Sequence, residues 1–174
     1  MSQELSLWER CKQTQLLILD VDGVLTDGSV IYSDSGEELK RFHVRDGAGI
    51  KVWQQSGRQV AILSGRSSTA VTRRATELGI SIVLQGQADK LAALQELQRM
   101  TGVEANLIAA MGDDLPDLPL LRSVGLAISV ADACDEVRNL ADYTTLVPGG
   151  HGAVREAIEW LLKQSGEWEQ LLPR

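Results

Sequence analysis

Aromatic residues are scarce in this sequence, which holds four Trp, two Tyr and one Phe. A buried core therefore has to be built from Leu, Ile, Val and Ala, which suits strands packed between helices. Cysteine is also rare, and Cys11 and Cys134 are too far apart in the sequence to show the paired spacing of a zinc site. We interpret them as two reduced thiols of a cytosolic protein.

Positive charge and long apolar runs are lacking as well. The chain has 17 Lys and Arg against 24 Asp and Glu, a net charge of −7, which argues against nucleic acid as a partner. It has no run of about 20 apolar residues that could span a membrane. Residues 1–15 also lack the apolar stretch of a signal peptide. We therefore expect a cytoplasmic protein without a membrane partner.

Short apolar runs alternate with segments of helical periodicity. The runs are 16–19, 60–63, 80–84, 107–111 and 126–128, and the helical segments are 67–78, 89–100 and 152–163. In the segment 89–100, Leu91, Leu94 and Leu97 lie on one face of the expected helix. Continuous runs of this length are typical of parallel strands buried on both faces. The alternation predicts an α/β protein, with a Rossmann-like three-layer α/β/α fold around a central parallel sheet.

One segment interrupts the alternation. Residues 29–32 and 38–44 predict a projecting β-hairpin around the turn Ser33-Asp34-Ser35-Gly36. At about 29–44 it is too short to be a domain, so we expect a flap over the site or an assembly element. The tail, 165–174, is expected to be loosely held.

Two carboxylates, Asp20 and Asp22, directly follow the first apolar run, and Gly23 allows the chain to turn sharply behind them. Ligands of such sheets bind at the carboxyl ends of the strands. Two like charges there are costly unless a cation compensates them, and Mg²⁺ prefers carboxylate oxygens. The alternatives are an ordinary loop or an incomplete calcium loop, but an EF-hand needs Asp or Asn where Val24 stands.

A second acidic cluster, Asp113, Asp114 and Asp117, follows another apolar run. By itself it could be a helix start with Asp in the first turn. Two acidic clusters after two buried strands, however, would repel each other across the edge of the sheet unless a cation lay between them.

Two further features suit a phosphate ligand. Ser64-Gly65-Arg66 follows a third apolar run and offers a hydroxyl and backbone amides, although alone it is more typical of a capped helix start. Lys90 begins a helical segment, and it is either a solvated surface charge or a cation that neutralises a nucleophile and a phosphate.

In chain order, Asp20-x-Asp22, Ser64, Lys90 and Gly112-Asp113-Asp114 resemble the four motifs of the haloacid dehalogenase (HAD) phosphatase superfamily, over nearly the whole chain. Further stretches resemble its capless branch, the 3-deoxy-D-manno-octulosonate 8-phosphate (KDO 8-phosphate) phosphatases. These stretches are Asp22-Gly23-x-x-Thr26-Asp27-Gly28, Arg45-Asp46-Gly47-x-Gly49-Ile50, Gly125-Leu126-x-x-x-Val130-Ala131-Asp132-Ala133 and Gly149-Gly150-x-Gly152-Ala153-Val154-Arg155-Glu156. The resemblance implies one HAD-like domain over residues 1–174 without a cap domain.

The resemblance implies Mg²⁺-dependent hydrolysis of KDO 8-phosphate through an aspartyl-phosphate, a step in lipopolysaccharide sugar biosynthesis. Asp20 would be the nucleophile and Asp22 the acid and base. The phosphoryl group would be held by Ser64, Gly65 and Lys90. Mg²⁺ would be bound by Asp20, the Asp22 carbonyl and Asp113, with Asp114 and Asp117 in supporting positions.

The resemblance also implies a path for the sugar acid. Its residues would be Asp22, His43, Val44, Arg45, Asp46, Gly47, Lys51, Gly65, Arg66, Arg74 and Lys90. In the branch, four subunits assemble and each hairpin helps to close a neighbour's site, which implies a homotetramer.

Three residues depart from the branch: His43 stands where Asn is frequent, and Lys51 and His151 stand where Arg is frequent. Lys lacks the bidentate grip of Arg, so the identity of the sugar stays open. One alternative is a phosphatase for a nine-carbon nonulosonate 9-phosphate. The other is a non-catalytic tetramerisation module, which has no need of the nucleophile, acid/base and metal-binding aspartates.

Overall fold

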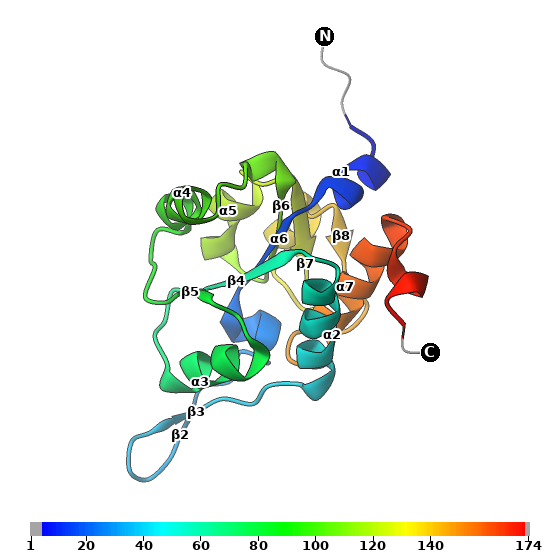
Figure 1. The fold of residues 1–174 in the computed structure, drawn as a ribbon. Coiled ribbons are helices and arrows are strands. Elements are labelled where there is room, and N and C mark those ends of the chain that lie inside the picture. The colour runs from blue at the N-terminus through cyan, green and yellow to red at the C-terminus, as the bar shows by residue number, and fades with distance from the viewer. Residues whose placement is uncertain (1–4, 173–174) are drawn as a thin grey trace.

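The computed structural model describes residues 5–172. Across these residues the main sheet has six strands, all parallel, in the order β5-β4-β1-β6-β7-β8 (Figure 1). The strands are β1 (Leu16–Leu19), β4 (Gln59–Leu63), β5 (Ile82–Leu84), β6 (Ile108–Gly112), β7 (Leu126–Ser129) and β8 (Tyr143–Thr144). Every residue of β1 is fully buried, as a central strand covered on both faces requires.

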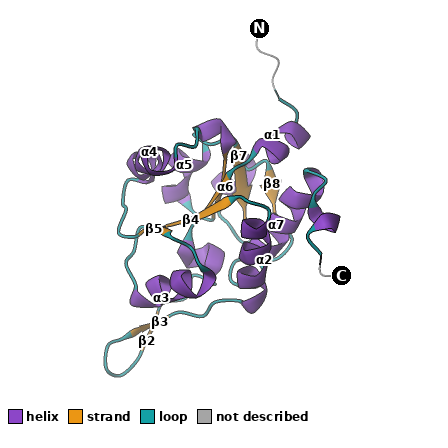
Figure 2. Ribbon diagram, in the orientation of Figure 1, coloured by secondary structure: helices purple, strands orange, loops and turns teal. Residues whose placement is uncertain are grey.

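Helices cover both faces of this sheet (Figure 2). They are α1 (Leu7–Gln13), α2 (Val44–Gln55), α3 (Thr69–Leu78), α4 (Lys90–Thr101), α5 (Leu118–Leu121), α6 (Asp135–Leu140) and α7 (Ala153–Gln164). On one side α7 packs against α1 and α2, and α2 contacts α3; on the other, α5 packs against α4 and α6. The predicted Rossmann-like α/β/α architecture is confirmed.

Local sequence explains where the central helices end and which faces they bury. Gly79 and Gly102 end α3 and α4 in the left-handed conformation, with φ of +71° and +70°. The buried face of α4 contains Lys90, Leu94 and Leu97. Leu91 lies at the margin of this face and is 39% exposed, because it points about 100° around the helix from Lys90.

The hairpin is shorter than expected. Its strands are β2 (Ile31–Tyr32) and β3 (Glu38–Leu39), and Gly36 makes the predicted turn with φ of +83°. The second strand does not continue to residue 44, because the chain leaves the pairing after Leu39 and α2 begins at Val44. The hairpin projects from the edge of the molecule beside α3 (Figure 1).

The tail is better anchored than expected. Arg58 binds the Glu167 carboxylate through both terminal nitrogens, at 2.6 and 2.7 Å, and Trp168 is only 8% exposed. The expectation of a loosely held tail was therefore wrong for residues 165–172; residues 173–174 lie outside the described part.

Among the helices described, none combines the length and the apolar character that a membrane crossing requires.

Candidate active site

The end of β1 leads directly into the turn that carries Asp20 and Asp22. Asp20 is 7% exposed, and after it the chain coils through an irregular helical turn, η1 (Val21–Leu25). Gly23 has φ of +93°, a conformation that favours glycine. A Cβ at Gly23 would lie 2.0 Å from Oδ2 of Asp113. Gly23 therefore allows the Asp113 carboxylate, which follows the neighbouring strand β6, to approach the turn.

The loop between β8 and α7 supports this turn from behind. A Cβ at Gly149 would lie 1.7 Å from the carbonyl oxygen of Gly23, so that position accommodates no side chain. The backbone N–H of Gly150 donates to the Val24 carbonyl at 3.0 Å. The Gly-Gly pair thus lets two loops pack backbone against backbone.

Lys90 lies between two carboxylates. Its ammonium group donates to Oδ1 of Asp20 at 2.8 Å and also to Oδ1 of Asp117, and the residue is 5% exposed. Burial lowers the pKa of Lys90, but the two carboxylates outweigh this effect and hold the pKa above its ordinary value. Lys90 is therefore a charged group inside the site and not a solvated surface lysine.

Asp117 organises the turn that follows β6. Its Oδ2 accepts hydrogen bonds from the backbone N–H groups of Asp113 and Asp114, at 3.0 and 3.3 Å. Its Oδ1 accepts from Lys90. Because both oxygens are engaged by the protein, the carboxylate is suited to holding Asp113 and Lys90 in place.

The site carries more negative than positive charge. Oxygens of Asp20, Asp113 and Asp117 lie within 4.8 Å of one another. Burial raises the pKa of Asp113 to about 8, and repulsion from the neighbouring aspartates adds to this effect. Burial also raises the pKa of Asp20, to about 6, although Lys90 opposes the shift. Buried carboxylate oxygens with uncompensated charge are a suitable set of ligands for a hard divalent cation.

A pocket of about 270 Å³ brings all four predicted catalytic residues together. Its lining residues are Asp20, Asp22, Ser64, Gly65, Arg66, Lys90, Asp113, Asp114, Pro116 and Asp117. Ser64 is buried at the end of β4, and its Oγ accepts from the backbone N–H of Arg66 at 3.2 Å. The carboxyl ends of β1, β4 and β6 therefore contribute to one pocket, as expected for a parallel sheet.

The rest of the expected sugar-acid path does not line this pocket. The residues concerned are His43, Val44, Arg45, Asp46, Gly47, Lys51 and Arg74. Val44 is 82% exposed, and Arg45 lines a separate pocket of about 410 Å³ that also includes His151. Lys51 is exposed on α2. Arg74 extends from α3 toward Phe42 and Gly47.

Asp46 occupies a structural position in this chain. It is 1% exposed, and its Oδ1 accepts from the backbone N–H of Arg155 at 2.8 Å, at the start of α7. Burial raises the pKa of Asp46, although this hydrogen bond opposes the shift. The carboxylate thus caps a helix that belongs to another part of the chain.

Sequence reasoning missed Lys40. Its side chain is 2% exposed and forms an ion pair with the Asp22 carboxylate. It follows β3, where a lysine on a hairpin is normally solvated, so no sequence signal marked it as buried.

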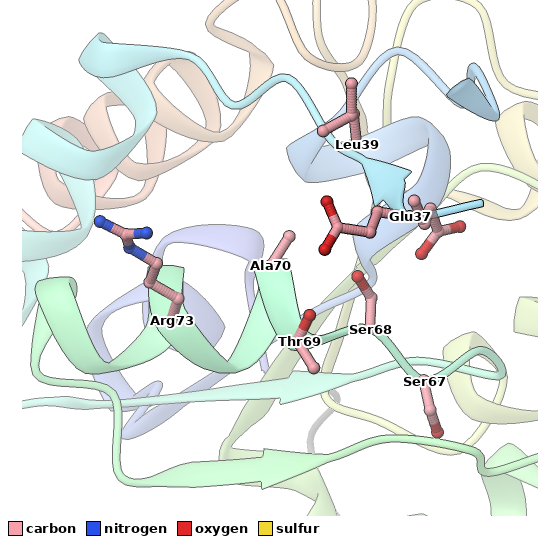
Figure 3. A pocket seen from close by; sticks show the side chains of 8 residues that line it. Glu37, Leu39, Ser67, Ser68, Thr69, Ala70 and Arg73 are labelled. Carbon is pink, nitrogen blue, oxygen red and sulfur yellow. The ribbon is translucent and has the colours of Figure 1, made fainter. Parts of the chain in front are cut away.

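A larger pocket of about 740 Å³ lies beside the site, between the hairpin and α3. It is lined by Glu37, Glu38, Leu39, Ser67, Ser68, Thr69, Ala70 and Arg73. Figure 3 shows Leu39 on the hairpin side, across from Ser68, Thr69 and Ala70 at the start of α3. This pocket lacks the acidic cluster, so the chemistry belongs to the smaller one.

Comparison with known proteins agrees with this geometry. Residues 81–158 match the family model of haloacid dehalogenase-like hydrolases. The chain is 44% identical over 161 residues to a KDO 8-phosphate phosphatase of Escherichia coli K12, covering 92% of this chain and 86% of that protein. The Haemophilus influenzae phosphatase of the same name is 42% identical over 159 residues, with 91% and 88% covered.

Solved structures give the same result. The KDO 8-phosphate phosphatase of Moraxella catarrhalis, in complex with magnesium ion, phosphate ion and KDO, superimposes with a TM-score of 0.91. It is 47% identical, and the match covers 94% of each chain. The cobalt-bound Haemophilus influenzae phosphatase has a TM-score of 0.88 at 42% identity, with 91% of this chain and 93% of that chain covered.

Proposed function

Because this chain belongs to the KDO 8-phosphate phosphatase family of the haloacid dehalogenase-like hydrolases, we propose that it hydrolyses KDO 8-phosphate to KDO and inorganic phosphate. One observation carries the proposal: the predicted nucleophile, acid/base, lysine and metal-binding aspartate line one pocket at the carboxyl ends of the strands. The magnesium, phosphate and KDO bound to the Moraxella relative support the same substrate and cation.

Mg²⁺ is the proposed cofactor. The side chains of Asp20 and Asp113 and the backbone carbonyl of Asp22 would hold it, and their excess negative charge supports this choice. When bound, Mg²⁺ would offset the charge of the carboxylates and of the phosphate. Asp114 and Asp117 would hold Asp113 in position.

In the first step, a carboxylate oxygen of Asp20 forms a bond to phosphorus while the bond from phosphorus to the sugar oxygen breaks. The Asp22 carboxyl gives its proton to the departing sugar oxygen. Lys90, the Ser64 hydroxyl and the Gly65 backbone hold the phosphoryl oxygens. The contact of Lys90 with Asp20 supports this role, because the same ammonium group can face nucleophile and phosphate.

In the second step, a water oxygen forms a bond to phosphorus, and the bond between phosphorus and the Asp20 oxygen breaks. The water proton passes to the Asp22 carboxylate, which restores both aspartates. Asp22 lies at the pocket wall with its side chain 21% exposed, so both the leaving group and water can reach it.

The remaining predicted residues belong to the proposed sugar-acid path. Arg66 has a side chain that is 49% exposed at the pocket, where its planar guanidinium suits the sugar carboxylate. The path residues that lie outside the pocket, from His43 to Lys51 and Arg74, would contribute in the assembled protein. Asp46 would do so indirectly, through its hold on the start of α7, because its own carboxylate is buried.

We further propose a cytoplasmic homotetramer of one-domain subunits, with the hairpin as a flap. Val30, Ile31, Tyr32 and Leu39 on the hairpin are 44–63% exposed, which supports their burial against another subunit.

The substitution Asp20→Asn tests the proposed nucleophile. It should lower kcat for KDO 8-phosphate by at least about 10⁴-fold, because the amide cannot attack phosphorus. The matched control is Asp135→Asn on α6, whose side chain is 79% exposed and which should retain wild-type turnover. Turnover of Asp20→Asn near the wild-type rate, with both proteins folded by circular dichroism, would contradict the assignment.

A further inference from the structure

Lys40 reaches from the end of β3 into the active site. Its ammonium group binds Oδ1 of Asp22, and its side chain is 2% exposed. Nε of Arg66 lies 3.8 Å from the other oxygen, Oδ2. The acid/base carboxyl is therefore held on both sides by cationic groups, one from the hairpin and one from the loop after β4.

Glu38 completes a closed ring of alternating charges. Its Oε1 lies 2.6 Å from Nη2 of Arg66 and 3.6 Å from Nζ of Lys40. Asp22, Lys40, Glu38 and Arg66 thus follow one another with alternating sign. Lys40 is the enclosed member of this ring, so removing its charge would leave the carboxylates of Asp22 and Glu38 without their buried partner. The half-exposed Arg66 holds the same two carboxylates less firmly.

The side chains of Lys40 and Arg66 differ in their exposure to solvent, and this difference indicates that the two cations have different roles. Arg66 has a side chain that is 49% exposed and can meet an incoming anion, whereas the ammonium group of Lys40 is enclosed. We propose that Lys40 is a positioning residue, which holds the Asp22 carboxyl in the orientation needed for proton transfer. This inference rests on the proposed function and adds a link between the hairpin and the chemistry.

Asp22 takes part in two proton transfers, one to the departing sugar oxygen and one from the attacking water. Substrates with different leaving groups allow the two transfers to be tested separately. A sugar oxygen needs a proton from Asp22 when its bond to phosphorus breaks. Nitrophenolate departs as an anion with the bonding electron pair and needs none, so with p-nitrophenyl phosphate only the second step depends on Asp22. Misplacing Asp22 should therefore slow both steps for the sugar phosphate and only the second for the aryl phosphate.

The test compares Lys40→Met and Lys40→Arg with the wild type, in saturating Mg²⁺. For Lys40→Met we expect kcat on KDO 8-phosphate to fall at least about 10-fold with KM within about 3-fold, since proton transfer contributes roughly 10²–10⁴-fold. On p-nitrophenyl phosphate the variant should release about one equivalent of nitrophenolate in a rapid phase, then turn over slowly. Lys40→Arg should recover most of kcat, because it restores the charge.

The matched control is Lys163→Met, which removes an ion pair of 3.1 Å between Lys163 and Glu159 on α7 and should behave as wild type. A raised KM with unchanged kcat in Lys40→Met would overturn the inference and make Lys40 a substrate contact. Equal losses of the rapid phase and of steady turnover, with a lower melting temperature, would also overturn it.

The turnover of the two substrates by the wild-type protein shows whether the proposed function or the role of Lys40 has failed. If it turns over only the aryl phosphate, the proposed substrate fails, and the rapid phase of Lys40→Met still decides the role of Lys40. If it turns over neither compound, the proposed function and the positioning role fail together.

Discussion

At the scale of the residue, the site depends on glycine as much as on its carboxylates, because a side chain at some positions would displace the catalytic groups. Asp20 and Asp113 directly follow the neighbouring strands β1 and β6, and the missing Cβ of Gly23 lets them share one pocket. The charge on these carboxylates is already unfavourable, as the raised pKa of Asp113 shows, because burial and the nearby aspartates disfavour its ionised form. Displacing the Asp113 carboxylate would therefore weaken the binding of the proposed Mg²⁺ ion.

Gly23→Ala should lower kcat at least about 10²-fold and weaken the dependence on Mg²⁺, because small displacements of catalytic groups have effects of that size. The control is Gly57→Ala. Gly57 has φ of +82°, close to the +93° of Gly23, but a Cβ there would meet nothing within 4 Å. Both variants carry the same kind of backbone strain, of about 1–2 kcal/mol. Equal activities of the two variants, measured by Mg²⁺ titration, would contradict the steric account.

The sequence predicted the site residues at strand ends better than a site residue that reaches the pocket from the hairpin. Asp20, Ser64 and Asp113 follow buried apolar runs, and a parallel sheet brings such positions to one edge. Lys40 could not be found in this way, because its burial depends on how the hairpin folds back on Asp22. The capping of α7 by Asp46 likewise depends on tertiary packing.

At the scale of the element, the sequence pattern missed the short elements α1, α5, α6 and β8, and it also failed at the hairpin and α2. Residues 38–44 look like one continuous strand, but the chain leaves the hairpin after Leu39 and α2 begins at Val44. Helix α2 carries Gly47 and Gly49 in its first turns, which weakens its intrinsic helical signal. Packing against α7 stabilises it instead, and a Cβ at Gly49 would lie 3.1 Å from Cα of Arg155.

The exposed apolar side chains of the hairpin lead to a prediction about assembly. Replacing both Ile31 and Tyr32 by Ser should shift the protein toward smaller species and raise KM, because the hairpin loses the apolar surface it would bury. Light scattering after size-exclusion chromatography measures the first effect, and steady-state kinetics the second. Met100→Ser on α4, where Met100 is 56% exposed, is the control. An unchanged mass and an unchanged KM in the double variant would refute the flap role.

At the scale of the whole molecule, an acidic protein gathers positive charge at one place. The chain has a net charge of −7, yet Lys40, Arg66 and Lys90 converge on the carboxylates of one small region. Phosphoryl transfer needs charge neutralisation and positioning more than any other contribution. The parallel sheet supplies the positions, and these cations, with a divalent metal, would supply the charge.

The most direct test of the proposed function is phosphate release from KDO 8-phosphate by the wild-type protein, with Mg²⁺ and with a chelator. A nonulosonate 9-phosphate and an aryl phosphate are measured beside it. We predict turnover that needs Mg²⁺ and that is fastest, by kcat/KM, on KDO 8-phosphate. Preference for the nine-carbon compound would retain the chemistry and contradict the substrate. No release from any compound would contradict the central claim and favour a non-catalytic assembly module.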